Sequence, residues 1–112
     1  MEFIVQNAIR QSEAMQSADF VIGNANIKVI GVGGAGGNMV SWLYKKGIKG
    51  AEIAAMNTDK QHLDIHEADR KVLIGRDLTK GLGAGGHAKV GSEAAKEALQ
   101  EIKDVLKDAD MV

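Results

Sequence analysis

A glycine-rich stretch near the start of the chain constrains the fold more than any other feature of the sequence. It reads Ile27-Lys-Val-Ile-Gly-Val-Gly-Gly-Ala-Gly-Gly-Asn38. The β-branched residues at its start suit a strand that is buried on both faces, because a covered parallel sheet needs near-continuous apolar side chains. The five glycines that follow permit positive φ and leave backbone N–H groups open to a ligand. The stretch therefore predicts a buried strand and a tight loop.

A helix is expected after this loop, from Met39 to Lys46, with Asn38 at its start. The first N–H groups of a helix have no intrahelical partner, and the helix dipole places partial positive charge at that end. We therefore expect an anion, such as a phosphate group, to bind there. Gly47 follows two lysines and suits the C′ position that ends a helix.

The next segments predict a parallel sheet. Residues Ala51–Met56 form a weak strand pattern after the helix, and a strand–helix–strand crossover makes the two strands parallel. This strand ends in Asn57-Thr58-Asp59, at the carboxyl edge where open α/β sheets bind ligands. A short helix over 60–66, capped by Thr58 or Asp59, and a third buried strand over 71–75 are expected to follow.

A second glycine-rich loop covers Thr79–Gly86, and the longest helix is expected after it, starting at Gly91-Ser92 with Ser92 as the N-cap. Residues Asp110–Val112 read as the start of a fourth strand. The long helix that starts at Gly91-Ser92 has one apolar stripe at spacings of three and four residues, formed by Ala95, Ala98, Leu99, Ile102, Val105 and Leu106.

Composition narrows the class of protein. The 112 residues have room for one domain, which we place at 27–112, after an N-terminal extension at 1–26. A net charge of −1 and four aromatic residues argue against nucleic acid as a partner. The absence of cysteine excludes a disulfide scaffold and a thiolate zinc site. No apolar run approaches the length of a membrane span, and the start does not resemble a secretory signal, so a cytoplasmic protein without membrane insertion is expected.

The extension at 1–26 has a different composition from the rest of the chain. Phe3, Ile4, Ala8 and Ile9 fall on one helical stripe, and polar residues dominate from Gln11 onward. We interpret this as a short helix followed by a linker. A disordered arm is the alternative, because an isolated helix of about ten residues is marginal in water.

The glycine spacing at Gly31, Gly33 and Gly36 matches the dinucleotide fingerprint G-x-G-x-x-G, in the strand–loop–helix context that the mechanism needs. A tight turn without a ligand would need only one or two glycines. No glycine is followed by lysine, which excludes a Walker-type phosphate loop. Because all loops after parallel strands emerge at one edge, the two glycine-rich loops are expected to face one crevice, which suits a polyphosphate.

Three side chains leave more than one interpretation. His62 and His66 are four residues apart, as in some metal sites, but Leu63 occupies the position where a zincin helix needs Glu. We interpret them as two histidines on a solvated helix face, and no metal site is predicted. Lys80 could contact phosphate or could be a solvated cation, and both interpretations remain open.

Taken together, these motifs resemble the amino-terminal part of the GTP-binding domain of FtsZ, the tubulin-like GTPase family of prokaryotic cell division. The resemblance implies an α/β fold with a Rossmann-like parallel sheet and helices on both faces, truncated after the start of the fourth strand. The motifs that carry it are the stretch 27–38, Asn57-Thr-Asp59, Gly81-Leu-Gly-Ala-Gly-Gly86 and Asp108-Ala-Asp-Met-Val112.

The resemblance also implies which residues bind GTP or GDP, with Mg²⁺ accompanying the nucleotide. Residues 33–38 correspond to the first phosphate loop, Asn57 and Asp59 to polar residues near the nucleotide, and 84–86 to the loop that senses the γ-phosphate. The expected binding residues are Gly33, Gly34, Ala35, Gly36, Gly37, Asn38, Asn57, Asp59, Ala84, Gly85 and Gly86.

No catalytic residue is assigned within this chain, because the acidic loop that activates water in this family corresponds to sequence beyond Val112. The resemblance therefore predicts a fragment that is inactive alone and needs the rest of the domain or a second chain. The complete protein is expected to be a GTPase completed at the protomer interface, forming head-to-tail homopolymers at the division site. Guanine specificity rests on the resemblance only.

This sequence departs from the family pattern at three places. Lys80 stands where Arg is common, His87-Ala88 replaces a stretch that usually carries proline, and residues 1–26 match no part of the pattern. The second departure puts the rigidity of the loop near position 88 in question. The competing function is a small Rossmann module that binds NAD, in which Asp59 would hold the ribose but the loop 81–86 would have no use.

Overall fold

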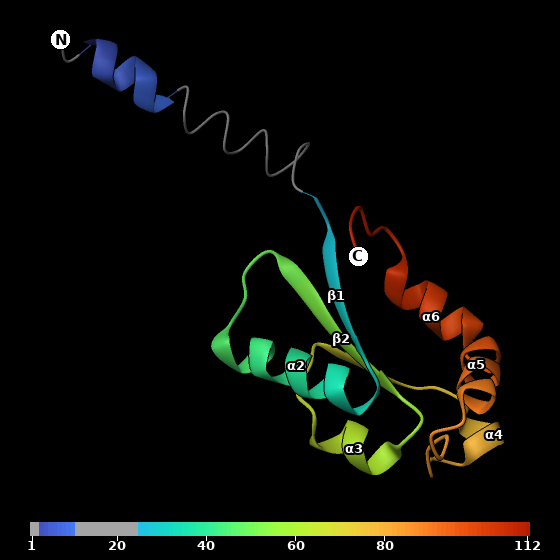
Figure 1. The fold of residues 1–112 in the computed structure, drawn as a ribbon. Coiled ribbons are helices and arrows are strands. Elements are labelled where there is room, and N and C mark those ends of the chain that lie inside the picture. The colour runs from blue at the N-terminus through green and yellow to red at the C-terminus, as the bar shows by residue number, and fades with distance from the viewer. Residues whose placement is uncertain (1–2, 11–24) are drawn as a thin grey trace.

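The computed structural model describes residues 3–10 and 25–112. Strands and helices alternate from residue 27 onward, which confirms the predicted α/β class (Figure 1). The elements are β1 (Ile27–Val32), α2 (Gly33–Lys46), β2 (Ala51–Asn57), α3 (Lys60–Ile65), β3 (Arg70–Leu73), α4 (Arg76–Thr79), α5 (Ala88–Glu97) and α6 (Leu99–Leu106).

The three strands form one parallel sheet in the order β1-β2-β3, as the crossover argument predicts. Between β1 and β2, Ile27 pairs with Ala51, and between β2 and β3, Ala54 pairs with Arg70. On the free side of β1, Met111 forms a parallel bridge to Ile27, and its carbonyl accepts a 2.9 Å hydrogen bond from the Lys28 N–H. Met111 therefore lies beside the amino end of β1, where the sequence predicts the start of a fourth strand.

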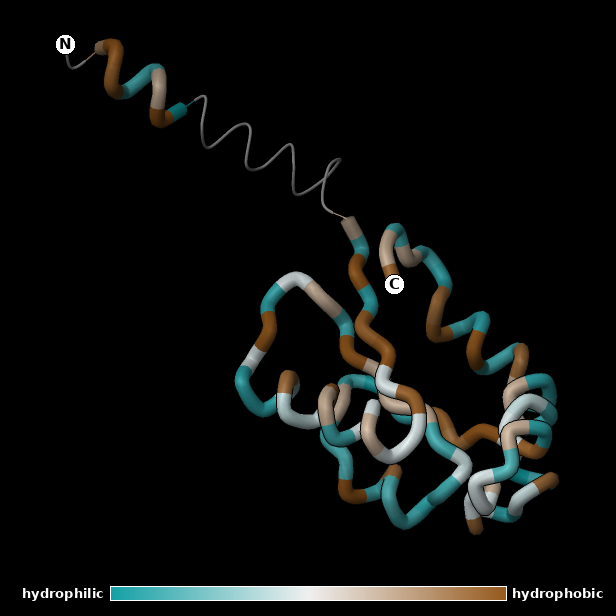
Figure 2. The backbone as a smooth tube through the Cα atoms, viewed as in Figure 1, coloured by the Kyte–Doolittle hydropathy of each residue, from teal (hydrophilic) through white to brown (hydrophobic). Residues whose placement is uncertain are grey.

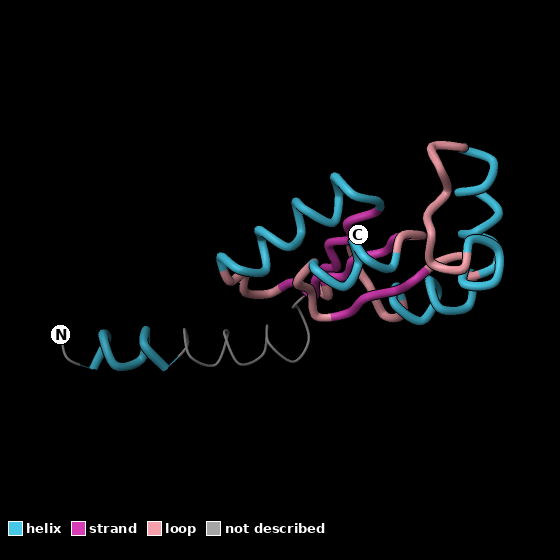
Figure 3. Tube along the Cα trace, turned by 90° about the horizontal axis from the view of Figure 1, so that it is seen from below, coloured by secondary structure: helices cyan, strands magenta, loops and turns pink. Residues whose placement is uncertain are grey.

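Helices cover both faces of the sheet, as predicted (Figure 3). Helices α2 and α3 cover one face and α5 and α6 the other, and Figure 2 shows the apolar residues gathered along the strands between them. The first core cluster consists of Val40, Ile53, Ala55 and Leu63. The second consists of Ala54, Met56, Val72, Ile74, Ala94, Ala98 and Val105. Alternate residues of β2 thus point into opposite cores.

The prediction that β1 is buried on both faces is wrong. Within this strand only Lys28 and Gly31 are buried, and Val32 is 62 % exposed. The central strand is β2, whose residues from Ile53 to Asn57 are all buried. The difference arises because β2 has a full neighbour on each side, whereas β1 pairs along its length with β2 only.

The last predicted helix starts earlier than expected and is divided. Helix α5 begins at Ala88 with His87 at the N-cap, so Ser92 is not a cap, and Ala98 separates α5 from α6 with φ −92° and ψ 16°. The apolar stripe differs accordingly, because Ala94 is buried in place of Ala95 and Leu99 is 52 % exposed. Ala94 packs closely against Gly75, where a Cβ would stand 2.5 Å from that of Ala94.

The described part of the extension contains the predicted helix, over residues 3–10, and all of its residues are exposed. The predicted linker lies outside the described residues up to position 24. Within 3–10 and 25–112, no helix has the length and apolar character needed to span a membrane.

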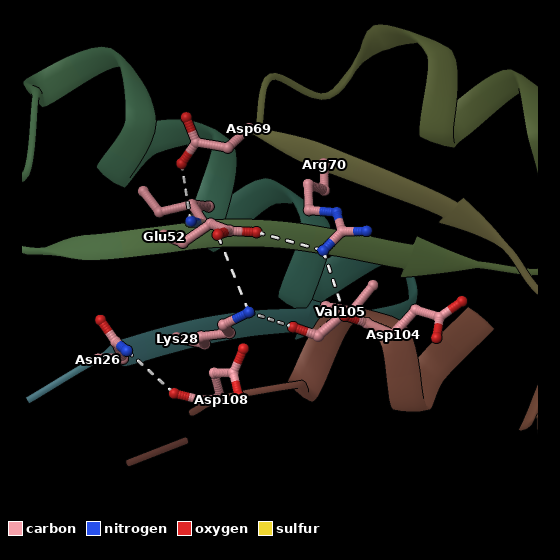
Figure 4. A network of polar contacts seen from close by, with 9 residues as sticks. Asn26, Lys28, Glu52, Asp69, Arg70, Asp104, Val105 and Asp108 are labelled. Atoms are coloured by element: carbon pink, nitrogen blue, oxygen red, sulfur yellow. Dashed lines mark hydrogen bonds and ion pairs between the residues drawn. The ribbon is translucent and has the colours of Figure 1, made fainter. Parts of the chain in front are cut away.

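Charged side chains join the three strands to α6 at the amino edge of the sheet (Figure 4). Lys28 Nζ lies 3.9 Å from Glu52 Oε2, and Arg70 Nη1 lies 3.7 Å from Glu52 Oε1. The two cations also donate to carbonyls in the last turn of α6, Lys28 to Val105 at 2.6 Å and Arg70 to Asp104 at 3.3 Å. They satisfy orphan carbonyls at the negative end of the helix dipole. The sequence analysis missed this network.

Candidate functional site

The expected site residues gather at the opposite, carboxyl edge of the sheet, where β1 and β2 end (Figure 1). The glycine-rich segment after β1 is not an extended loop. Helix α2 begins at Gly33, six residues before the predicted start at Met39. Gly33 alone turns the chain, with φ 77°, and Gly34, Ala35, Gly36, Gly37 and Asn38 form the first turns of the helix.

Close packing explains why glycine stands at the other positions. A Cβ on Gly31 would come within 2.3 Å of the Gly36 carbonyl oxygen, and a Cβ on Gly36 would lie 3.1 Å from the Gly31 carbonyl carbon. Helix α2 therefore starts with its backbone directly against the backbone of β1. This geometry leaves no side chain between the helix N-terminus and an approaching ligand at Gly33 and Gly34.

The helix N-termini at this edge fall into two groups. Helix α3 is capped by Asp59, and the N–H groups of Asp77 and Leu78 in α4 donate to the Glu97 carboxylate at 2.9 and 3.2 Å. Helices α2 and α5 have neither a side-chain cap nor an acidic residue in the first turn. Each of these two follows one of the glycine-rich segments. Their N–H groups and positive dipole ends remain available to an anion.

Asn57 and Asp59 order the end of β2. Asn57 is buried, and its Oδ1 accepts a 3.0 Å hydrogen bond from the Asp59 N–H. Asp59 Oδ1 accepts from the His62 N–H at 3.2 Å, which selects Asp59 over Thr58 as the cap of α3. One oxygen of each side chain is thus committed to local structure, and Asp59 Oδ2 has no hydrogen bond to another described residue.

The second glycine-rich loop pairs with this segment. Asp59 and Leu82 form an antiparallel bridge, framed by hydrogen bonds from Lys60 N–H to the Gly81 carbonyl at 3.0 Å and from Gly83 N–H to the Thr58 carbonyl at 3.2 Å. The polar residues at the end of β2 and residues 81–83 of the second glycine-rich loop therefore lie side by side, as predicted. Lys80, which ends α4, is exposed and has φ 55°.

Ala84, Gly85 and Gly86 continue from this pairing toward α5. The two glycines are exposed and have φ of 63° and 77°, and Ala84 is half-buried. The Ala84 carbonyl accepts from the His87 N–H at 3.2 Å, which forms a turn just before α5 without the proline of the family pattern. Residues 84–86 lie at the same edge as the start of α2, and no hydrogen bond joins them to α2 among the described residues.

Helix α3 and the residue after it pack against the first turns of α2. A Cβ on Gly34 would lie 3.5 Å from His62 Nδ1, and a Cβ on Gly37 would lie 2.2 Å from His66 Cε1. His62 is exposed as predicted, but the prediction that His66 is solvated is wrong. His66 is 4 % exposed, and its Nε2 lies 2.9 Å from Asn38 Oδ1. Burial lowers the pKa of His66, and the nearby charges of His62 and Lys71 lower it further.

Sequence reasoning missed three residues that shape this edge. His66 contacts α2, the Ser41 hydroxyl accepts a 3.0 Å hydrogen bond from the Glu67 N–H, and Glu97 caps α4. No local signal identifies Ser41 or Glu97, because their partners lie about 20 residues or more away in the chain. His66 ends a short helix, and no local pattern indicates its burial, because its partner Asn38 lies 28 residues away.

A parallel α/β sheet with two uncapped helix N-termini after glycine-rich turns defines the class of Rossmann-like nucleotide-binding folds. Residues 26–112 match the family model described as Tubulin/FtsZ family, GTPase domain. Because this match covers most of the chain, the chain belongs to the Tubulin/FtsZ family.

Individual relatives agree with this family. The chain is 45 % identical to cell division protein FtsZ 2 of Haloferax volcanii, over 100 % of this chain and 30 % of that protein. A solved FtsZ dimer of M. jannaschii, described as empty, superposes with a TM-score of 0.81 and 48 % identity, covering 89 % of this chain and 29 % of that one. A GTPγS-bound protofilament of CetZ2 from Haloferax volcanii gives 0.63 and 30 % identity over 73 % of this chain and 26 % of that one.

The chain thus spans about 30 % of the length of the relatives it matches. The match to the Haloferax volcanii protein includes residues 1–26, so these residues have a counterpart in a relative although the family model starts at residue 26.

Proposed function

We propose that the carboxyl edge of this sheet binds the phosphates of GTP or GDP. The observation that carries the proposal is the contrast between helix N-termini: α3 and α4 are neutralised by carboxylates, whereas α2 and α5 are not. An anion bound at α2 and α5 would meet unpaired N–H groups and two positive dipole ends. Membership of a family described as a GTPase domain supports a guanine nucleotide.

The binding roles follow the position of each segment. Backbone N–H groups of Gly33 to Gly37 would hold one phosphate at the start of α2, and Asn38 would add a side-chain donor. Asn57 and Asp59 would contact the nucleotide from the end of β2. Ala84, Gly85 and Gly86 would contact the terminal phosphate, which makes this loop sensitive to the difference between GTP and GDP. Mg²⁺ would accompany the phosphates and neutralise part of their charge.

The whole protein is proposed to be a GTPase that assembles into head-to-tail filaments at the division site of a prokaryotic cell. Relatives named as cell division proteins and solved structures described as a dimer and a protofilament support self-association. The domain is proposed to begin at residue 27, after the extension 1–26. Residues 27–112 are proposed to bind nucleotide through backbone groups and to lack the groups that activate water for hydrolysis.

Titration with fluorescent GTP, GDP and NAD tests the binding proposal in the full polypeptide that the gene encodes. We expect saturable binding of both guanine nucleotides and no binding of NAD. NAD binding without GTP binding would contradict the proposal and favour a dinucleotide module instead.

A second experiment concerns the 112 residues alone. We expect no phosphate release from GTP, and association in sedimentation as the concentration rises. Among residues 3–10 and 25–112, only Met111 forms a bridge to the outer edge of β1, and unpaired strand edges template association. A compact monomer that turns over GTP unaided would show that these residues already contain the catalytic groups.

A further inference from the structure

The buried histidine at the end of α3 has a contact that the proposed function does not use. His66 Nε2 lies 2.9 Å from Asn38 Oδ1, across 28 residues of sequence. A carboxamide oxygen only accepts hydrogen bonds, so Nε2 carries the proton and donates it. His66 Nδ1 is buried and has no hydrogen-bond partner among the described residues. The neutral imidazole is therefore the form that fits this position.

The ring also packs against the backbone of α2. A Cβ on Gly37 would fall 2.2 Å from His66 Cε1 and 2.3 Å from Nδ1, so only glycine leaves room for the ring. One residue further, the Glu67 N–H donates to the buried Ser41 hydroxyl at 3.0 Å. The end of α3 is thus attached to α2 at Gly37, Asn38 and Ser41.

The start of α3 is attached to the polar residues at the end of β2. Asp59 caps the helix, and the Asn57 side chain holds the Asp59 N–H. Helix α3 is only six residues long, so a rigid element of about 9 Å joins the end of β2 to the first turns of α2. His66 is the side chain through which this connection reaches Asn38.

We propose that His66 is a positioning residue for the nucleotide site, which orients the Asn38 amide and fixes the first turns of α2 from α3. The inference rests on the proposed function. Because Oδ1 of Asn38 accepts from His66, the two N–H groups of the amide are left to donate to a ligand oxygen. Phosphate oxygens accept such donors, and a flipped amide would present its oxygen to the phosphate instead.

Substitutions that keep or remove the donor test this role in the full encoded polypeptide. Gln at position 66 carries an N–H donor at similar reach, whereas Leu carries none. We expect His66→Leu to weaken GTP binding about tenfold and His66→Gln to stay within about threefold of the wild type. Gln61→Leu is the matched control, since Gln61 is exposed on the same helix, and it should leave the affinity unchanged.

A double-mutant cycle separates positioning from general packing. If His66 acts through Asn38, adding His66→Leu to Asn38→Ala should cost little further GTP affinity. Thermal unfolding without nucleotide, measured on the same variants, reports the packing contribution separately. Should His66→Leu fail to fold, His66→Asn replaces it, because this shorter amide does not reach Asn38.

The outcomes are distinct. Additive losses in the cycle, or a lowered melting temperature with unchanged GTP affinity, would overturn the positioning role and leave the proposed function intact. A wild-type protein that binds no guanine nucleotide would overturn both. The positioning role would be established by three results together: His66→Leu loses GTP affinity, His66→Gln retains it, and the effects of His66→Leu and Asn38→Ala are not additive.

Discussion

The two edges of the sheet are built in opposite ways. At the amino edge, long charged side chains meet, and Lys28 and Arg70 neutralise the C-terminal carbonyls of α6. At the carboxyl edge, glycines bring backbone against backbone, and the N-termini of α2 and α5 are not neutralised. At the amino edge, side chains donate hydrogen bonds to the helix carbonyls, whereas the carboxyl edge leaves main-chain donors unused.

This difference separates stability from binding. The polar network at the amino edge contributes to folding, and removing one member leaves its partners unpaired in a partly buried place. Unused helix N-termini contribute nothing to folding until an anion arrives. Substitutions at the amino edge are therefore expected to change unfolding, and substitutions at the carboxyl edge to change nucleotide affinity.

Gly36→Val is expected to have the largest effect. The Cβ at this position would lie 3.1 Å from the Gly31 backbone, and the branched side chain would stand at the start of α2. Affinity for GTP, measured by titration of the full encoded polypeptide, should fall at least about 100-fold, or about 3 kcal/mol.

Gly34→Ala separates blocked binding from disturbed packing in that test. A Cβ there has ordinary contact with His62 at 3.5 Å, so the variant should fold normally and still bind GTP more weakly. Unchanged GTP affinity in both variants would mean that the glycine-rich segment is only a turn.

Lys28→Met addresses the amino edge. It removes the donor to the Val105 carbonyl and the partner of Glu52 but keeps a side chain of similar length. The free energy of unfolding should fall by about 2 kcal/mol, because a buried acceptor loses its bond. Chemical denaturation measures this loss, and GTP affinity of the folded protein should not change. A large change in GTP affinity would show that the amino edge also contributes to nucleotide binding, contrary to the separation of stability from binding.

Gly85→Leu addresses the second glycine-rich loop. We expect GTP to lose about tenfold more affinity than GDP, because the loop is proposed to contact the terminal phosphate. Gly50→Leu is the matched control at the amino edge: Gly50 also has positive φ, 87°, with nothing within 4 Å of an added Cβ. Equal losses for GTP and GDP in Gly85→Leu would place the loop away from that phosphate.

Acid should produce the smallest effect. Burial lowers the pKa of His66 below the ordinary value of 6.5, so the unfolded chain binds a proton more readily than the folded one. The contribution of neutral His66 is complete above pH 6.5 and is lost as the pH falls through the lowered pKa. Unfolding curves between pH 7.5 and about 5 should show a steeper loss for the wild type than for His66→Gln. Parallel curves would exclude His66 as the group responsible.

Local patterns in the sequence predicted the three strands and most of the helices in order, but not α4 and not the division between α5 and α6. β-Branched runs predicted β1 and β3, and the glycine at position 47 predicted the end of α2, because propensity and capping act over a few residues. The weak pattern of β2 was identified by its position after that helix. Gly47 has φ 78°, and its N–H bonds to the Leu43 and Tyr44 carbonyls as a C′ glycine should. The crossover rule then predicted a parallel sheet without any knowledge of packing.

Contacts between distant residues were not predictable in the same way. The glycines of 33–37 predicted a loop because glycine permits positive φ, but only Gly33 uses that freedom and the others pack in the first turns of α2 against β1 and His66. The close approach of Ala94 to Gly75 joins residues 19 positions apart and places Ala94, not Ala95, in the core. The network around Lys28 joins residues up to 77 positions apart, a separation that no local pattern records.

The attachment of β1 to the far end of the chain has a kinetic consequence. Asn26 N–H donates to the Asp110 carboxylate, and Lys28 N–H to the Met111 carbonyl, across more than 80 residues. Contacts of such separation close late, because the entropy of a large loop must be lost before they form. During synthesis at about 5–20 residues per second, several seconds therefore pass between the synthesis of β1 and that of the segment at Asp110 and Met111 that bonds to it. Its outer edge is exposed to other chains throughout that interval.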